Sequence, residues 1–319
     1  MNYLMNTWRM GACSLFILGL IAFSGCDSLR QEVNPDRLNR EAAKLVVTCF
    51  LSPQDTVLAV KVTRSQPVLG VSTSFSYQGV DVTNATVTLA EGSRTATLHY
   101  DGKLGYYRAP VSLLPIVAGR TYSISVQTPA GEQATASTFI PELVPLTDIL
   151  LDSAITNEYG RATKQYYVRL RWRDPAGKPN FYQIMGDNEH TYTNQYRPSP
   201  SAPVRDTTVT SRGKWFFNNS STTTDIGRDG QELVSARGRL STVYSFTNGK
   251  QDLSRPVGKL NAYLLNVDEA YFRYYDAVER QNQLGDNPFA EPVPVPTNIL
   301  GGLGCFAGYN RSSLTIELK

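Results

Sequence analysis

The sequence predicts an all-β protein: an N-terminal immunoglobulin-like sandwich over residues 44–141, then a second β-domain over residues 146–319 with one inserted α-helix over residues 267–281. Two observations support this prediction. Short runs of alternating apolar and polar residues recur along the chain, which is the period of half-buried strands. Turn-forming residues separate these runs at the close spacing typical of sandwiches.

Residues 1–25 are predicted to be a secretory leader. Arg9 precedes an apolar run over residues 11–23, and this run is shorter than the about 20 residues needed to cross a bilayer. The run ends at Ser24-Gly25-Cys26, where two small residues before a cysteine fit a narrow peptidase site. We expect cleavage before Cys26 and lipidation of its thiol, since two or more acyl chains give stable anchoring. The alternative is ordinary secretion with Cys26 as a structural thiol.

Residues 26–43 are polar and are interpreted as a tether between lipid and fold. The full chain carries 31 basic and 28 acidic residues, a net charge of +3, so it offers no electrostatic footprint for nucleic acid. After Cys26 no apolar stretch approaches the length of a membrane helix. We therefore expect contact with the membrane through the lipid alone.

Two cysteines, Cys49 and Cys305, remain once Cys13 leaves with the leader and Cys26 is modified. In an oxidising compartment they could form a disulfide. Both lie in apolar segments, where a free thiol packs as a small hydrophobe. Two separate buried thiols are the favoured interpretation, and the disulfide is the alternative.

The N-terminal strands are predicted from period-two alternation at residues 44–51, 56–65, 85–89, 95–100, 121–127 and 133–140. Pro141 and Pro145 then interrupt any ladder and mark the domain boundary. The second domain is predicted to hold strands at residues 146–155, 165–173, 180–185, 214–218, 231–237, 239–246, 259–265 and 312–318. The polar segment over residues 187–212 is interpreted as a long surface excursion.

The single predicted helix follows Asn266, a candidate cap, with Glu269 three residues later as in a capping box. Val267, Tyr271 and Val278 recur at helical spacing and define its apolar face.

Four elements in a fixed order carry a family likeness. They are the leader ending at Cys26, the strand pair of Lys44–Leu51 and Val60–Pro67, the helix segment Glu269–Tyr275, and the ending with Asn287-Pro-Phe and Pro296–Gly304. Together they resemble the Bacteroidota lipoprotein family called domain of unknown function 4249. The resemblance implies an outer-membrane lipoprotein, with a TonB-dependent transporter as a candidate partner. Cys26 is followed by Asp-Ser-Leu-Arg-Gln-Glu instead of an acidic run, so the periplasmic and extracellular faces both stay open.

No catalytic, metal or cofactor site is predicted. The chain has two histidines, His99 and His190, and neither lies in a recognised catalytic or zinc motif. The segment Asp225–Gly230 hints at a calcium loop, but its twelfth position is Ala236 where a glutamate belongs, so a turn is favoured. The glycines of Gly301–Gly304 lack the lysine of a phosphate loop and are expected to allow close backbone approach or a tight turn.

Aromatic residues give one binding hypothesis. Tyrosines with Trp172 and Trp215 could line a sugar- or peptide-binding surface, and Tyr192 and Tyr196 are the exposed candidates. The favoured interpretation is that most of these rings fill the core. The expected function is a non-enzymatic binding or accessory component of outer-membrane uptake; the alternatives are a structural or adhesive surface protein and an envelope hydrolase with a dispersed acidic site.

Overall fold

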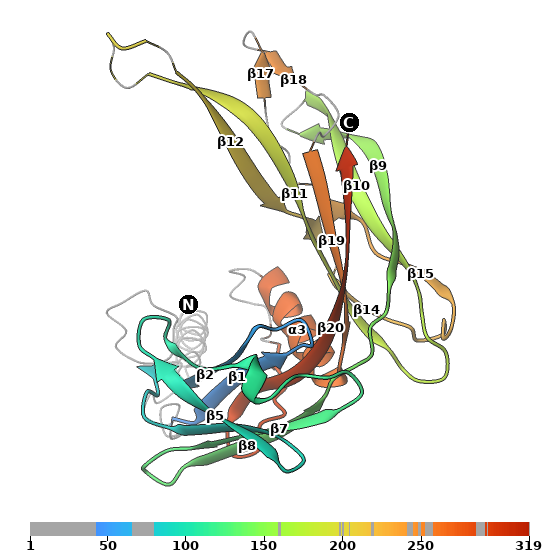
Figure 1. Ribbon diagram of the computed structural model, residues 1–319. Coiled ribbons are helices and arrows are strands. Elements are labelled where there is room, and N and C mark those ends of the chain that lie inside the picture. The colour runs from blue at the N-terminus through green and yellow to red at the C-terminus, as the bar shows by residue number, and fades with distance from the viewer. Residues whose placement is uncertain are drawn as a thin grey trace, which may run out of the picture. The chain divides into compact units, whose positions relative to one another are not determined.

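The computed structural model describes residues 43–65, 80–158, 161–197, 199, 201–203, 205–217, 220–240, 245–247, 250–252, 258–284, 291 and 293–318. Over these residues the prediction of an all-β fold with one inserted helix is confirmed. In the described part of the chain, the α-helix is α3 (Glu269–Gln283), one 3-10 turn covers Val111–Leu113, and the other elements are strands (Figure 1).

The N-terminal strands lie close to their predicted positions. They are β1 (Leu45–Leu51), β2 (Val57–Arg64), β3 (Val80–Asp81), β4 (Thr86–Glu91), β5 (Arg94–Asp101), β6 (Tyr106–Pro110), β7 (Thr121–Gln127) and β8 (Gln133–Phe139). Seven of them follow one another in the antiparallel order β1-β2-β6-β5-β4-β7-β8. In β7, every second residue from Tyr122 to Val126 is buried while its neighbours are exposed. The alternation therefore sets which face of each strand enters the core.

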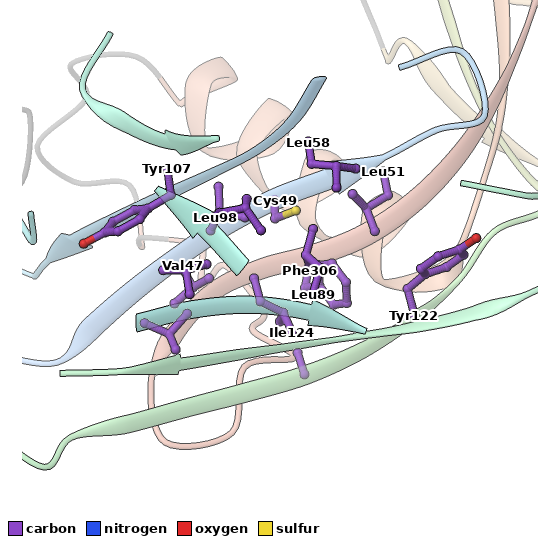
Figure 2. Packing of buried hydrophobic residues seen from close by; sticks show 14 of the residues in the cluster. Val47, Cys49, Leu51, Leu58, Leu89, Leu98, Tyr107, Tyr122, Ile124 and Phe306 are labelled. Carbon is purple, nitrogen blue, oxygen red and sulfur yellow. The ribbon is translucent and has the colours of Figure 1, made fainter. Parts of the chain in front are cut away.

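The N-terminal core lies between the two halves of this sheet, which curls over on itself. Side chains from β1, β4 and β7 meet there, among them Val47, Leu89 and Ile124, and Phe306 joins them from the C-terminal part of the chain (Figure 2). The curl is closed at its edge, because Thr135 in β8 and Leu300 exchange backbone hydrogen bonds of 2.9 and 2.8 Å.

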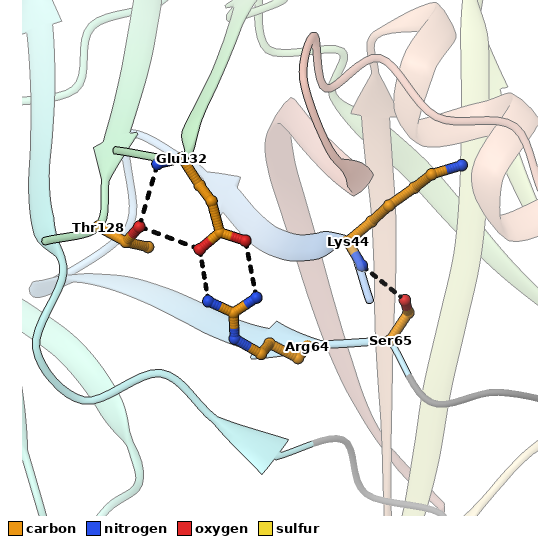
Figure 3. Close-up of polar contacts among 5 residues, drawn as sticks. All are labelled: Lys44, Arg64, Ser65, Thr128 and Glu132. Atoms are coloured by element: carbon orange, nitrogen blue, oxygen red, sulfur yellow. Dashed lines mark hydrogen bonds and ion pairs between the residues drawn. The ribbon is translucent and has the colours of Figure 1, made fainter. Parts of the chain in front are cut away.

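An ion pair beside the start of β8 also stabilises the curl. At the end of β2, both terminal guanidinium nitrogens of Arg64 donate hydrogen bonds to the Glu132 carboxylate. The Thr128 hydroxyl donates to the same carboxylate (Figure 3). The bond with Arg64 keeps the pKa of Glu132 below its usual value. Because a forked arginine–carboxylate pair has fixed geometry, it sets the position of the β7–β8 turn against β2.

In the C-terminal region, the continuation of the same large sheet and a separate five-stranded sheet enclose a second core. Its strands are β9 (Leu146–Glu158), β10 (Arg161–Arg173), β11 (Phe181–Tyr196), β12 (Arg205–Lys214), β13 (Phe216–Phe217), β14 (Thr222–Thr224), β15 (Glu232–Val234), β16 (Gly238–Arg239), β17 (Ser245–Thr247), β18 (Lys250–Asp252), β19 (Gly258–Val267) and β20 (Leu303–Leu318). Trp172 from β10 and Tyr182 from β11 meet edge to face with ring centroids 5.1 Å apart. This aromatic pair joins the β9–β10 sheet to the β11–β19–β20 sheet.

One strand belongs to both regions. The first half of β20 pairs in parallel with β1, from Val46 opposite Leu303 to Leu51 opposite Gly308, and the second half pairs antiparallel with β19. Figure 1 shows this strand in red, running from the curled sheet into the C-terminal sheet. The predicted boundary at residues 141–145 coincides with the connection between β8 and β9, but the sandwich takes in residues 303–308 from beyond it.

Two sequence interpretations need correction. The segment over residues 187–212 is not an irregular excursion, because β11 and β12 pair along it from Asp187 opposite Lys214 to Tyr196 opposite Arg205. The helix begins two residues later than predicted, and its cap is Asp268, whose side chain accepts from the Tyr271 N–H at 2.8 Å. Asn266 instead is the next-to-last residue of β19, and its side-chain amide donates to the Glu142 carbonyl oxygen at 2.9 Å.

Candidate functional site

A pocket of about 440 Å³ opens beside the C-terminal half of α3. Its floor comes from β11 and β19, one wall from the helix, and the other wall from the chain between β12 and β14. It is lined by Gln183, Ile184, Met185, Gly186, Asp187, Lys214, Trp215, Phe216, Phe217, Ser220, Ser221, Tyr263, Glu279, Asn282 and Gln283. This volume falls in the range of about 300–1,000 Å³ that is usual for small-molecule sites.

Trp215 lines the pocket from the second core, on the Gly186 face of β11. Because side chains alternate along a strand, the Asp187 carboxylate leaves β11 on the opposite face. The Trp215 backbone N–H donates to the Gly186 carbonyl oxygen at 3.0 Å, which holds the residue against β11. A Cβ at position 186 would lie 2.3 Å from ring atom Cε3, so only glycine leaves room for the indole there. The indole N–H of Trp215 is buried and has no hydrogen-bond partner among the described residues.

Phe216 and Phe217 follow Trp215 and form β13, so their side chains leave the strand on opposite faces. Phe216 is 56% exposed, while Phe217 is half-buried and packs on the second core. Phe216 is therefore the exposed ring at the rim of the pocket.

Glu279 supplies the helix side of the pocket. It lies eight residues after Tyr271, so the 3.6-residue period puts both on the helix face that meets β11. The Ser220 hydroxyl donates to Oε2 at 2.7 Å and the Ser221 N–H donates to the same atom at 3.1 Å, while the Ser221 hydroxyl donates to Oε1. These three bonds fix the carboxylate in one orientation.

The buried end of the helix wall is neutral. Burial keeps the pKa of Tyr271 well above its usual value, so its hydroxyl stays protonated and donates to Gln183 Oε1 at 2.5 Å. The Gln183 amide is thereby oriented with its nitrogen toward the Ser221 hydroxyl, at 3.4 Å.

Asp187 supplies the opposite acid. The Asn261 side-chain amide donates to its Oδ1 at 2.8 Å, and Thr315 in turn donates to the Asn261 oxygen at 2.9 Å, which settles which way that amide faces. Arg212 Nε lies 3.4 Å from the same Oδ1. The pocket therefore presents two fixed carboxylates, one on β11 and one on α3.

The binding and lipidation residues predicted from the sequence lie outside this pocket or outside the described residues. Tyr192 and Tyr196 lie on β11 with Val209 and Arg205 as strand partners, but their side chains are outside the described residues, so the ligand surface assigned to them stays a prediction. Trp172 is fully buried in the second core, as the core interpretation expects. The lipidation site, Cys26, also lies outside the described residues.

The two remaining cysteines are free and buried. Thr48 is paired with Cys305 on neighbouring strands, whereas Cys49 is paired with Phe306. Because side chains alternate along a strand, this offset sends the two thiols to opposite faces of the sheet. Cys49 packs in the N-terminal core, Cys305 packs under α3, and no disulfide joins them.

Three carboxylates gather at another place, where the turn after β10 meets the chain between β14 and β15. Oxygens of Asp174, Asp225 and Asp229 lie within 4.8 Å of one another, and the first two residues are buried. Burial, together with the neighbouring charges of Asp174 and Asp229, raises the pKa of Asp225. Among the described residues, these are the side chains that could hold a metal ion.

Hydrogen bonds within this acidic group fasten the loops that carry it. The Tyr182 hydroxyl donates to Asp174 at 2.5 Å, the Asn180 N–H to Asp225 at 2.9 Å, and the Gly177 N–H to Asp229 at 2.9 Å. Asp229 and Gly230 lie in a turn, as predicted.

Sequence reasoning missed most of the pocket. Glu279 carried a usable signal, because it continues the helix face marked by Tyr271. Ser220 and Ser221 carried none, since the serine-rich segment is polar throughout and only the pairing of β14 with β11 brings it to the helix.

Comparisons with known proteins agree with the resemblance found in the sequence. Among the described residues, no helix combines the length and apolar composition needed to span a bilayer.

No curated protein matches the chain. The model of one family matches residues 30–315, which is nearly the whole chain. The chain therefore belongs to the family described as Domain of unknown function (DUF4249).

Proposed function

We propose that this chain is a lipid-anchored protein of the outer membrane that binds a small ligand in the pocket beside α3 and assists its uptake through a TonB-dependent transporter. The pocket is the observation that carries the binding role. It combines the exposed Phe216 ring with acids and amides held in place by other side chains. Such pre-ordering lowers the entropy lost on binding.

The anchoring part of the proposal rests on the sequence. Residues 11–23 are apolar and end at two small residues before Cys26, which is the arrangement of a leader that is removed before a lipidated cysteine. Two or more acyl chains on that cysteine would hold the protein on a bilayer without a spanning segment.

Membrane fractionation of the Cys26→Ser variant tests the anchor. We expect the wild-type protein in the outer-membrane fraction and the variant in the soluble fraction. Cys13→Ser is the matched control, because it removes a thiol from the leader and leaves the cleavage site intact. Equal membrane association of wild type and Cys26→Ser would contradict the anchor.

Affinity purification from solubilised outer membranes tests the accessory role. We expect a TonB-dependent transporter in stoichiometric amount. Recovery without a transporter, combined with binding of the cells to matrix components, would favour the structural or adhesive function instead.

A second candidate function is an envelope hydrolase. Asp187 and Glu279 both line the pocket, and paired carboxylates can act as general acid and base on a glycosidic bond. Turnover of envelope glycans that is lost in both Asp187→Asn and Glu279→Gln would favour this function. Binding without turnover would favour the accessory role.

A further inference from the structure

We propose that the outer edge of β12 binds the β12 strand of a second copy of this chain, so that two molecules form a symmetric antiparallel pair. This inference is independent of the pocket and of its ligand. β12 is the last strand of the large sheet, whose order begins β12-β11-β19-β20. Among the strands that the structure describes, none pairs with the outer edge of β12.

β11 and β12 extend beyond the strand that supports them. β19 pairs with β11 as far as Glu189, opposite Lys259, whereas β12 pairs with β11 as far as Tyr196, opposite Arg205. Figure 1 shows β11 and β12 side by side, extending toward the upper left. In the described part of the chain, residues 190–196 have β12 on one side and no strand on the other. Because a two-stranded ribbon is only marginally stable in water, a further strand would stabilise it.

The centre of β12 lacks the features that usually protect an edge strand. Natural proteins protect such edges with proline, bulges or charged side chains. Residues 207–211 are Thr-Thr-Val-Thr-Ser, without proline or charge, and their pairing with β11 runs without a register shift. Threonine and valine also favour strands. This edge can therefore accept a further strand.

The charges at the two ends of β12 favour a second copy in one register. If the strands pair antiparallel about Val209, Asp206 of each copy lies opposite Arg212 of the other. Arg205 then lies opposite Gly213, so no like charges meet, and the two uncharged centres align along their whole length. Opposite charges that face each other across two strands stabilise the pair. Because the strand meets its own copy, the contact closes at two molecules.

Arg212 is placed to receive the acid of the second copy. Its Nη2 lies 2.8 Å from Glu189 Oε2 and its Nε lies 3.4 Å from Asp187 Oδ1, both on β11. The Arg212 side chain is still 60% exposed, and a guanidinium carries five N–H donors. In the pair, Asp206 of the second copy approaches from the side away from β11, with Lys214 as its diagonal neighbour. Acidic and basic groups then alternate across the contact.

Cysteine cross-linking in intact cells tests the pair on the full chain. The Cα atoms of two directly opposite residues in antiparallel strands lie about 4.5–5.5 Å apart, which is within the range of about 4.4–6.8 Å that disulfides span. We therefore expect Val209→Cys to form a disulfide-linked dimer under mild oxidation, visible on a non-reducing gel. Wild type should form none, because Cys49 and Cys305 are buried.

Thr207→Cys and Ser211→Cys are the matched controls. Thr207 of one copy lies opposite Ser211 of the other, so its own counterpart is four residues away, about 13 Å along the strand. Each control alone should stay uncross-linked, while the two produced together should form a mixed dimer. Val209→Cys and the mixed pair should give at least about tenfold more dimer than either control, since disulfides do not span more than about 7 Å. Thermal unfolding checks that the three variants are folded.

A change of charge tests the register separately. Asp206→Arg, added to Val209→Cys, should lower the yield of dimer about threefold or more, because like charges directly opposite destabilise a strand pair. Glu317→Arg is the control, since it brings the same basic side chain to a position on β20 that is 68% exposed. It should leave the yield unchanged.

Four results would overturn the inference. The first is that neither Val209→Cys nor the mixed pair forms a dimer, and the second is that Thr207→Cys alone forms as much dimer as Val209→Cys. The third is an unchanged yield in Asp206→Arg, which would reject the charge pairing. The fourth is that a photo-cross-linking residue at position 209 captures a different protein and no second copy, which would assign the edge to another partner.

Discussion

Asp225 shows how burial changes the chemistry of one side chain. It is 4% exposed, and its pKa is raised first by that burial and then by the charges of Asp174 and Asp229. A carboxyl whose pKa is raised in the folded state stabilises the fold only while protonated. That contribution is full below its ordinary pKa of about 3.9 and is lost as the pH rises through the raised value.

We therefore expect Asp225→Asn to raise the free energy of unfolding at pH 7, on the order of 1 kcal/mol. The amide keeps an oxygen for the Asn180 N–H, and its nitrogen can donate to the neighbouring carboxylates. The gain should vanish near pH 3, where the wild-type carboxyl is neutral. Urea unfolding at both pH values, in the presence of a chelator, measures the difference; a less stable variant at pH 7 would contradict this account.

The two buried thiols make a second residue-scale prediction. Burial raises the pKa of Cys305 to about 12 and raises that of Cys49 as well. Since the thiolate is the reactive form, neither cysteine should react with a thiol reagent in the native protein at pH 8. Two thiols should react after unfolding without a reductant, because Cys13 is removed and Cys26 is acylated. Fewer than two would indicate a disulfide.

The sequence located the cysteines but left their pairing open. Whether they can bond depends on the register of β1 against β20, and no local pattern shows that a strand from the end of the chain lies beside the first one. Contacts between distant segments leave no local pattern, which also explains why the aromatic hypothesis named Trp215 but missed Glu279 in the same pocket.

At the scale of elements, the start of α3 depends on Asp268. Its carboxylate caps the helix and also accepts from the Thr138 hydroxyl and the Gly308 N–H, so it joins the helix to β8 and β20. Asp268→Ala should lower the free energy of unfolding by about 2–3 kcal/mol, because a lost cap costs about 1 kcal/mol and the buried donors lose their acceptor.

Glu269→Ala is the control for this prediction. Its carboxylate pairs with Arg273 on the exposed side of the same turn, and such pairs contribute about 0.3–0.5 kcal/mol. Equal destabilisation by the two substitutions in urea unfolding would show that Asp268 is not the cap. The sequence suggested Asn266 because the capping pattern fits both residues, and only the extent of β19 decides between them.

Strand β20 depends on Gly304. Its φ is +111°, and a Cβ there would lie 2.1 Å from the Val47 carbonyl oxygen. Gly304→Ala should lower the free energy of unfolding by about 3 kcal/mol or more, since backbone strain of about 1–3 kcal/mol adds to the overlap with β1.

Gly92→Ala is the matched control, because Gly92 also has a positive φ, +57°, but nothing lies within 4 Å of its added Cβ. Gly92→Ala should lower the free energy of unfolding only by the backbone strain of a positive φ, about 1–2 kcal/mol. Similar losses for the two variants in urea unfolding would contradict the close approach of β20 to β1. The sequence predicted that the glycines of Gly301–Gly304 allow close backbone approach or a tight turn, and the close approach is confirmed. It did not show that β20 begins at Leu303 instead of residue 312.

At the scale of the whole molecule, the sequence predicted the fold class from alternation and the family from the order of its elements. It did not show the β11–β12 hairpin, because that segment is polar on both faces and so lacks the apolar alternation that marks a half-buried strand. It also did not show that one C-terminal strand pairs with both β1 and β19, since strand pairing over such a distance leaves no local pattern.

The claim on which the proposed function depends is that lipid at the start of the processed chain holds this protein on the membrane. Mass spectrometry of the N-terminal peptide from the membrane-bound protein tests it most directly. We predict a peptide that begins at Cys26 and carries diacylglycerol on its sulfur, with residues 1–25 absent. A membrane-bound protein whose N-terminal cysteine carries no lipid, or whose leader is retained, would contradict the account.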